Sequence, residues 1–126
     1  MSKVFKADAI KLIGEQLAQI GTLRRLAADT MEFKTWKQTT SLYIEKIFGS
    51  ESKNLKSFEK IHFVPIAWAE GMDESYWYPR CFNGGLDESQ VLLGRLMHEV
   101  ELFGEDSLAV TARVLSFPLT IQAFFT

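Results

Sequence analysis

Hydrophobic residues in the N-terminal part of the chain recur at the spacing of a helix. Four of them follow one another at intervals of three or four positions: Ile10, Ile13, Leu17 and Ile20. This spacing predicts one apolar face of a helix within residues 6–28, and Arg24 takes the next position of the same face. The face either packs against the domain's own core or forms a dimer interface that would include Ile13 and Leu17.

Residues 30–61 predict two further helices separated by a glycine. Thr30 suits the N-cap of the first helix, and Gly49 suits the left-handed residue that ends it. One face of that helix carries Phe33, Trp36, Thr40, Tyr43, Ile44 and Ile47. Ser50 or Ser52 then caps a short third helix. The buried side of the third helix is expected to hold Leu55, Phe58 and Ile61.

The helical pattern is interrupted between residues 62 and 86. Residues 62–67 contain strand formers around Pro65, which predicts an extended segment or a short edge strand. Residues 68–85 hold three glycines and one proline, which predicts a loop. Asp87 followed by Gln90 has the spacing of a capping box, so we predict a helix from Asp87 to Phe103. Residues 108–126 fit either a helix or a strand.

Together these elements predict a mainly α-helical protein. We expect one compact domain over residues 1–126, with four or five helices, a short extended segment and an aromatic loop. A chain of 126 residues with 47% hydrophobic residues suits one domain with a substantial core. The single cysteine excludes an intrachain disulfide.

Charge and hydropathy narrow the possible partners. The net charge of -2 argues against general nucleic-acid binding. No apolar run approaches the ~20 residues that a membrane span needs. We therefore expect a cytoplasmic protein that binds neither nucleic acid in general nor a membrane.

The sequence offers few groups for catalysis. His62 and His98 stand in no metal-binding motif, and His98 with Glu101 supplies too few ligands for a metal. Cys81 lies beside Arg80, but no histidine is near it in the sequence. We expect no enzymatic activity, no metal and no cofactor.

The predicted loop carries the most distinctive side chains. Six residues form a candidate ligand-binding set: Trp68, Tyr76, Trp77, Tyr78, Arg80 and Asn83. Aromatic faces stack on planar rings, arginine pairs with phosphate or carboxylate, and asparagine reads polar edges. A nucleotide-like ligand would use this mixture, and so would a protein interface. The third interpretation is a loop folded over the core with its aromatic residues buried.

The C-terminal residues are unusually apolar for a chain end. Five of them are candidate interface residues: Phe117, Leu119, Ile121, Phe124 and Phe125. They either pack against the chain's own core or form a contact between subunits. We expect a homo-oligomer.

A longer pattern covers much of the chain. It comprises Trp36, Tyr43-Ile44, Ile47-Phe48-Gly49, Ser52, Phe58, Ile61, Phe63, Phe82, Gly85-Leu86 and the stretch Leu92 to Glu101. The pattern resembles the small helical domain that precedes TIR-type effector domains in some bacterial antiphage proteins, and small stand-alone bacterial or phage proteins. The resemblance implies a sensing, oligomerising or inhibitory module in phage–bacterium conflict. It implies no catalytic residues.

Two functions follow as hypotheses. The first is a non-catalytic binding module that sequesters a nucleotide-derived signal or a defence protein through the aromatic and arginine residues. The alternative is a homo-oligomerising adaptor domain with no small-molecule ligand.

Overall fold

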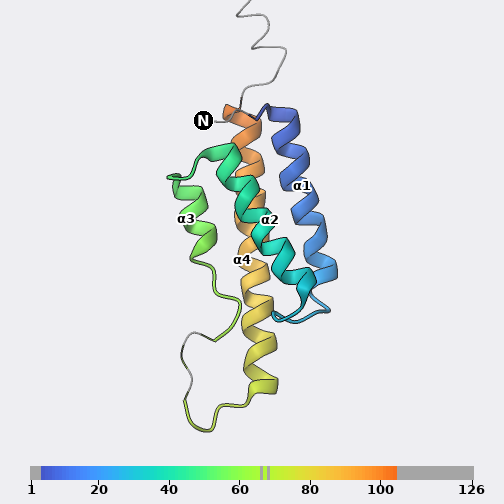
Figure 1. The fold of residues 1–126 in the computed structure, drawn as a ribbon, viewed down its shortest axis with the longest axis vertical. Helices are drawn as coiled ribbons and strands as arrows, with labels where there is room; N and C mark the ends of the chain where they lie inside the picture. The colour runs from blue at the N-terminus through green and yellow to red at the C-terminus, as the bar shows by residue number, and fades with distance from the viewer. Residues whose placement is uncertain (1–3, 66, 68, 105–126) are drawn as a thin grey trace, which may run out of the picture.

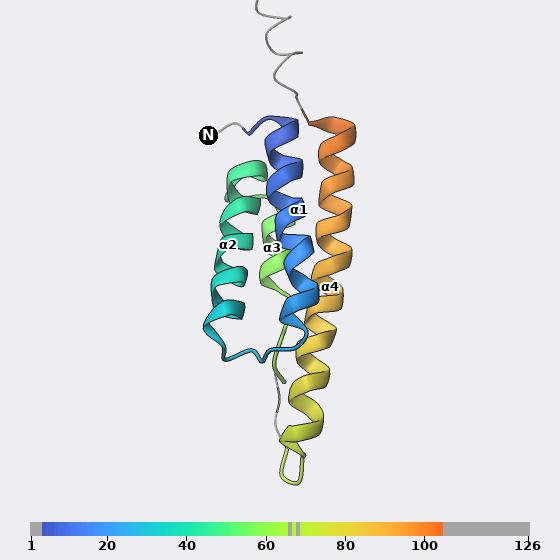
Figure 2. The same cartoon turned by 90° about the vertical axis from the view of Figure 1, so that its right-hand side faces the viewer.

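Four helices follow one another along the described part of the chain. The computed structural model describes residues 4–65, 67 and 69–104. The helices are α1 (Lys6–Leu23), α2 (Met31–Phe48), α3 (Lys53–Glu59) and α4 (Glu74–Phe103). The long helix α4 packs along α1, α1 packs on α2, and the short α3 lies against α2 and α4 (Figures 1 and 2). The mainly α-helical fold predicted from the sequence is confirmed.

The boundaries of α2 and α3 are set by local capping contacts. The Thr30 side chain accepts a hydrogen bond from the backbone N–H of Phe33 at 3.3 Å. The Ser52 side chain accepts one from the N–H of Leu55 at 3.1 Å. Gly49 ends α2 with φ of 107°, a conformation that favours glycine. The predicted roles of Thr30 and Gly49 are confirmed, and of the two predicted caps for the third helix, Ser50 and Ser52, the structure shows Ser52.

The core is built from one face of every helix. Its largest fully buried apolar side chains are Ile13, Trp36, Ile44, Phe58, Leu86, Leu93 and Leu96. Burying a side chain of this size contributes about 1.5–3 kcal/mol. Ile13 is only 1% exposed, so the apolar face of α1 packs inside the domain.

A buried polar network joins α1 to α2. The Trp36 indole N–H donates to the carbonyl oxygen of Gln16 at 3.0 Å. The Gln16 amide nitrogen donates to the Trp36 carbonyl at 3.3 Å and to the Thr40 hydroxyl at 2.7 Å. The Gln16 amide oxygen accepts from Gln19 at 3.1 Å. Because the polar atoms of the Gln16 side chain are bonded, its burial carries no desolvation penalty for an unpaired group.

The prediction of a loop up to residue 85 is wrong from Glu74 onward. Helix α4 begins there, and its N-cap Asp73 accepts from the N–H of Ser75 at 3.0 Å. Pro79 lies inside the helix, at a cost of about 3 kcal/mol. Phe82 and Leu86 are buried one turn apart on the core face of the helix, and each contributes about 1.5–3 kcal/mol. Tertiary packing therefore outweighs the local penalty of the proline.

Gly85 allows the chain after α3 to lie directly against α4. A Cβ at this position would lie 2.5 Å from Cδ1 of Phe63 and 2.7 Å from the carbonyl oxygen of His62. The Phe63 ring is buried and meets the Phe33 ring edge-on, with centroids 4.8 Å apart. Residues 61–65 form neither a helix nor a strand, so the edge-strand alternative is not realised. The close approach brings Val64 to the first half of α4.

The choice between helix and strand for residues 108–126 concerns residues outside the described part of the structure. None of the described helices combines the length and the low polarity that crossing a membrane requires.

Candidate functional site

A cleft of about 610 Å³ lies between the α1–α2 connection and the first half of α4. Its volume falls within the ~300–1,000 Å³ that small-molecule sites occupy. The lining residues are Arg24, Leu26, Ala27, Ala28, Asp29, Lys34, Val64, Tyr78, Pro79, Phe82 and Asn83. These residues come from four parts of the chain that the fold brings together.

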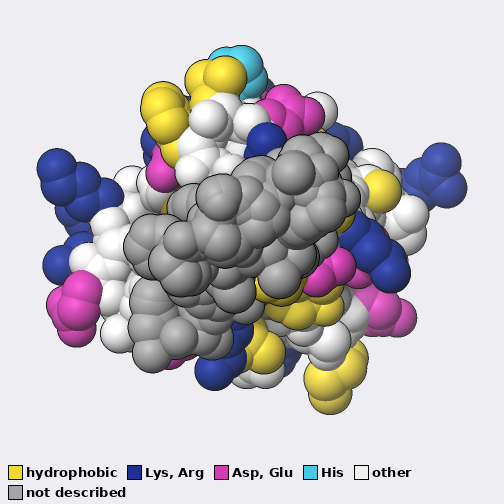
Figure 3. Space-filling model, turned by 90° about the horizontal axis from the view of Figure 1, so that it is seen from above, with side chains coloured by type: hydrophobic (Ala, Val, Ile, Leu, Met, Phe, Trp, Pro, Cys, Tyr) yellow, Lys and Arg dark blue, Asp and Glu magenta, His cyan; other side chains and the backbone are white. Residues whose placement is uncertain are grey.

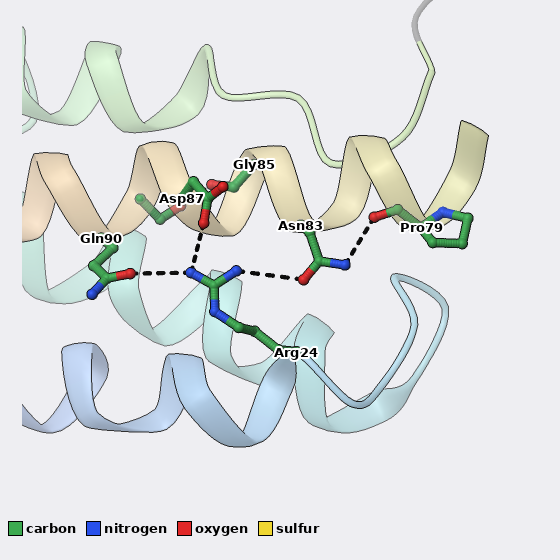
Figure 4. A network of polar contacts seen from close by, with 7 residues as sticks. Arg24, Pro79, Asn83, Gly85, Asp87 and Gln90 are labelled. Carbon is green, nitrogen blue, oxygen red and sulfur yellow. Dashed lines mark hydrogen bonds and ion pairs between the residues drawn. The ribbon is translucent and has the colours of Figure 1, made fainter. Parts of the chain in front are cut away.

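Arg24 forms a polar network at one edge of the cleft (Figure 4). Its guanidinium lies 2.7 Å from the Asp87 carboxylate and donates to the Gln90 amide oxygen at 3.0 Å. It also donates to the Asn83 amide oxygen at 3.4 Å, and Asn83 in turn donates to the Pro79 carbonyl at 3.0 Å. The network fixes the arginine in position because three side chains of one rigid helix hold it.

The interpretation of Asp87 and Gln90 as a capping box is wrong. Both lie in the interior of α4, more than three turns after its first residue. Their side chains instead bind Arg24, which follows the last residue of α1. Asp87 and Gln90 therefore connect α4 to the residue after α1, and they do not cap the start of a helix.

The cleft combines three kinds of chemistry. Leu26, Val64 and Phe82 give it an apolar wall. The phenol ring of Tyr78 supplies a flat aromatic face with a polar edge. Among the lining residues, Arg24 and Lys34 carry positive charge and Asp29 carries negative charge, and Asp87 beside the cleft pairs with Arg24. Such an arrangement suits a ligand with a planar ring and an anionic group.

Only some of the predicted ligand-binding residues line the cleft. Tyr78 and Asn83 line the cleft, whereas Tyr76, Trp77 and Arg80 do not. The Tyr76 and Trp77 rings meet edge-on with centroids 4.9 Å apart, and the Arg80 guanidinium lies 4.9 Å from the centre of the Tyr76 ring. Trp68 lies outside the described residues.

The three aromatic residues do not cover the core. Tyr76, Trp77 and Tyr78 are 49%, 38% and 44% exposed. The interpretation of this segment as a buried core cover is therefore wrong for these side chains. Exposed aromatic residues of this size are typical of binding surfaces.

Several cleft residues were missed by the sequence analysis. Lys34 and Val64 stand in ordinary helical and extended contexts, so no local pattern distinguishes them. Arg24 gave one signal, since it occupies the apolar face of α1 at a position where an apolar residue would be expected. A polar residue on such a face needs a partner, and its partners lie about sixty residues further along the chain.

The predicted interface residues occupy different environments. Ile13 is buried in the core, and Leu17 is partly buried and packs against the core. The α1 face thus follows the core-packing alternative. The five C-terminal candidates, Phe117, Leu119, Ile121, Phe124 and Phe125, lie outside the described residues.

Of the three groups considered for catalysis, His62 is exposed in the segment after α3, whereas Cys81 and His98 lie on α4. His98 Nδ1 lies 4.0 Å from a carboxylate oxygen of Glu101, and both side chains are largely exposed. Cys81 is a half-buried free thiol. Among the residues that the structure describes, no three His, Cys, Asp or Glu side chains gather as a metal site.

The described residues form an all-α fold with an opening of ligand size between the α1–α2 connection and the first half of α4. Comparison with known proteins found no matching family model, no matching curated protein and no matching solved structure. The resemblance to the domain associated with TIR-type effectors therefore stays a prediction.

Proposed function

We propose that this chain is a non-catalytic binding module that holds a nucleotide-like anion in the cleft between the α1–α2 connection and α4. The observation that carries the proposal is the meeting of Tyr78, an apolar wall and two cationic side chains in one cleft. The tyrosine ring offers a stacking surface for a base. Lys34 and Arg24 offer charge for a phosphate.

The two cationic side chains, Arg24 and Lys34, differ in how much of their charge is available to a ligand. The carboxylate of Asp87 already neutralises Arg24 at 2.7 Å. Lys34 forms no ion pair with any residue that the structure describes, and it is exposed at the cleft. Lys34 is therefore the main attraction for an anion, while the fixed Arg24 shapes the site. A site that is ordered before binding loses less entropy when the ligand arrives.

The biological setting of the proposal rests on the sequence resemblance alone. We propose a nucleotide-derived signal of phage–bacterium conflict as the ligand and sequestration as the mode of action. Sequestration needs affinity and abundance without turnover. The concave shape of the cleft favours a small molecule over the other predicted ligand, a defence protein.

Fluorescence polarisation with ADP carrying a methylanthraniloyl label tests the proposal. Tyr78→Ala is expected to weaken binding by about 5- to 150-fold, since stacking of one base on an aromatic ring contributes ~1–3 kcal/mol. Lys34→Ala is expected to weaken binding and to reduce its dependence on salt. Unlabelled ADP should compete with the label.

Tyr76→Ala is the matched control. Tyr76 lies two residues earlier on the same helix and is similarly exposed, but it does not line the cleft. Its substitution is expected to leave the affinity unchanged. Equal losses for Tyr76→Ala and Tyr78→Ala would contradict the assignment of the site. Absence of saturable binding up to about 1 mM would contradict the proposed ligand class.

A homo-oligomerising adaptor is the second candidate function. A separate observation favours it: among the described residues, six of the nine exposed large hydrophobic side chains belong to α4. Oligomerisation without nucleotide binding in the assays above would favour this candidate alone. The two functions do not exclude each other, because the cleft and the outward side of α4 are different surfaces.

A further inference from the structure

The charged side chains at the cleft balance one another. Arg24 and Lys34 line the cleft and are positive, whereas Asp29 lines it and is negative. Asp87 adds a second negative charge beside the cleft, because one of its carboxylate oxygens lies 2.7 Å from the Arg24 guanidinium. Two positive and two negative charges therefore lie at the same site. The site has local charges for a ligand but no excess positive charge that would hold several negative ones.

Arg24 offers a ligand hydrogen bonds rather than uncompensated charge. A guanidinium carries five N–H groups. Three hydrogen bonds of Arg24 go to Asn83, Asp87 and Gln90 (Figure 4). Its remaining N–H groups have no partner among the described residues, and the side chain is 32% exposed. Arg24 can therefore donate to a ligand oxygen, while Asp87 cancels its charge.

Lys34 and Asp29 are the charged groups of the cleft that remain available. Both are exposed, and neither forms an ion pair with any residue that the structure describes. The Lys34 ammonium can bind one anionic oxygen. The Asp29 carboxylate accepts hydrogen bonds only, so it suits a hydroxyl or amino group of the ligand and repels further negative charge. A ligand with one negative charge and several hydrogen-bond donors satisfies both side chains.

The rest of the molecule adds no long-range attraction for a polyanion. The chain carries a net charge of -2, which disfavours the approach of highly negative ligands. At the end of the bundle where α1 begins and α4 ends, the described basic and acidic side chains are interspersed around the edge (Figure 3). The selection of a ligand by its charge therefore depends on the few charged groups at the cleft.

We infer that the cleft prefers a nucleotide with a singly charged phosphodiester to a phosphomonoester or a polyphosphate, and that Asp87 sets this preference by neutralising Arg24. The inference rests on the proposed function, because it names the charge class of the ligand in the same cleft. A phosphomonoester carries about 1.5–2 negative charges at neutral pH, and each added phosphate increases the charge. The additional charge meets Asp29 and Asp87 but no further cation among the lining residues. ADP still binds, but with a lower affinity than the phosphodiester.

Coulomb's law gives the expected size of the effect. The Asp87 carboxylate and a phosphate on the other side of the Arg24 guanidinium would be about 9 Å apart. Near a protein surface, a unit charge at this distance changes the affinity by about 1.5- to 3-fold per unit of ligand charge, at an ionic strength of about 0.03 M. ADP carries about two charges more than cyclic AMP, which is a phosphodiester. Removal of the Asp87 charge should therefore change the ratio of their affinities by about 2- to 9-fold.

Titration of the full chain with unlabelled cyclic AMP, AMP and ADP tests the inference. The amide shifts of residues 26–29 give a dissociation constant for each nucleotide. In the wild type, cyclic AMP should bind at least as tightly as AMP, and AMP at least as tightly as ADP. In Asp87→Asn, the ratio of affinities should shift towards ADP by about 2- to 9-fold, and the shift should shrink at about 0.5 M salt. Asparagine keeps an oxygen that accepts from Arg24, so the variant removes the charge and retains the contact.

Glu101→Gln is the matched control. It also removes one negative charge from α4, and the Glu101 side chain is 54% exposed. Glu101 lies fourteen residues after Asp87, which is about 21 Å along the helix. Screened charges at this distance act weakly, so the ratio of affinities should stay within about 1.3-fold of the wild-type ratio. Circular dichroism of both variants checks that the helices are retained.

Three results would overturn the inference while leaving nucleotide binding in the cleft intact. They are a wild-type affinity that rises from cyclic AMP to ADP, a ratio of affinities that is the same in Asp87→Asn as in the wild type, and an equal change of that ratio in Glu101→Gln. A different result would contradict the proposed function itself. If none of the three nucleotides gives saturable shifts, both the proposed function and the preference that rests on it are wrong.

Discussion

Gly85 provides the sharpest test of how the structure positions the cleft. An alanine at this position places a methyl group 2.5 Å from Cδ1 of Phe63 and 2.7 Å from the carbonyl oxygen of His62. One contact is with backbone, and the buried Phe63 ring is held by the Phe33 ring. Neither neighbour can move without disturbing the core. Overpacking of this kind costs about 1–3 kcal/mol.

Gly84 is the matched control because it precedes Gly85 in the same helix and has open space around it. In both positions alanine favours the helix by about 0.5–1 kcal/mol relative to glycine. Gly84→Ala should therefore stabilise the protein by that amount. Gly85→Ala should be about 1–3 kcal/mol less stable than Gly84→Ala, because only the steric term differs.

Urea unfolding followed by circular dichroism measures both free energies of unfolding. For a domain of this size, each kcal/mol also shifts Tm by about 3–5 °C. Gly85→Ala should in addition weaken nucleotide binding, since Val64 follows the displaced segment and lines the cleft. If Gly85→Ala were as stable as Gly84→Ala, the close contact between residues 62–63 and α4 would be refuted.

Three further substitutions test other parts of the fold. Gln16→Leu should lower the free energy of unfolding by about 1–3 kcal/mol in urea, because it removes the donor of two buried hydrogen bonds to α2, whereas Gln38→Ala, at an exposed position of α2, should change it by less than about 0.5 kcal/mol; equal effects would contradict the buried network. Arg24→Met should lower stability by at most about 1 kcal/mol, because the guanidinium pair is partly exposed, and the loss should shrink at high salt. A loss unaffected by salt would show that Arg24 acts through packing. Pro79→Ala should raise the helix content, and it should raise the free energy of unfolding by up to about 3 kcal/mol, both measured by circular dichroism. A lower stability of this variant would show that the proline ring is held by the cleft wall.

The sequence predicted the elements whose signals are local. Thr30, Gly49 and Ser52 act through contacts with residues only a few positions away, so their roles can be recognised without the fold. The start of α4 could not be recognised in this way. Pro79 and Gly85 are unfavourable in an isolated helix, and only burial against distant segments makes a helix there the more stable structure.

The candidate site was only partly predicted from the sequence, because contacts between distant segments leave no local signal. Tyr78 and Asn83 were chosen for their chemistry, and both line the cleft. Arg24 and Lys34 come from a different part of the chain, and only the packing of α1 and α2 beside α4 brings them to the same place. Composition identifies side chains that can bind a ligand, but the fold decides which of them face each other.

The most direct test of the central claim is the mapping of ADP binding by amide chemical shifts in a ¹H–¹⁵N correlation spectrum. The cleft assignment predicts that titration with ADP shifts the amides of residues 26–29, 78 and 80–83 in a saturable manner. Amides on the far side of the molecule, including residues 46–52 at the end of α2, should not move. Shifts confined to that distant region, or no saturable shifts at all, would contradict the proposal that the cleft binds a nucleotide-like anion.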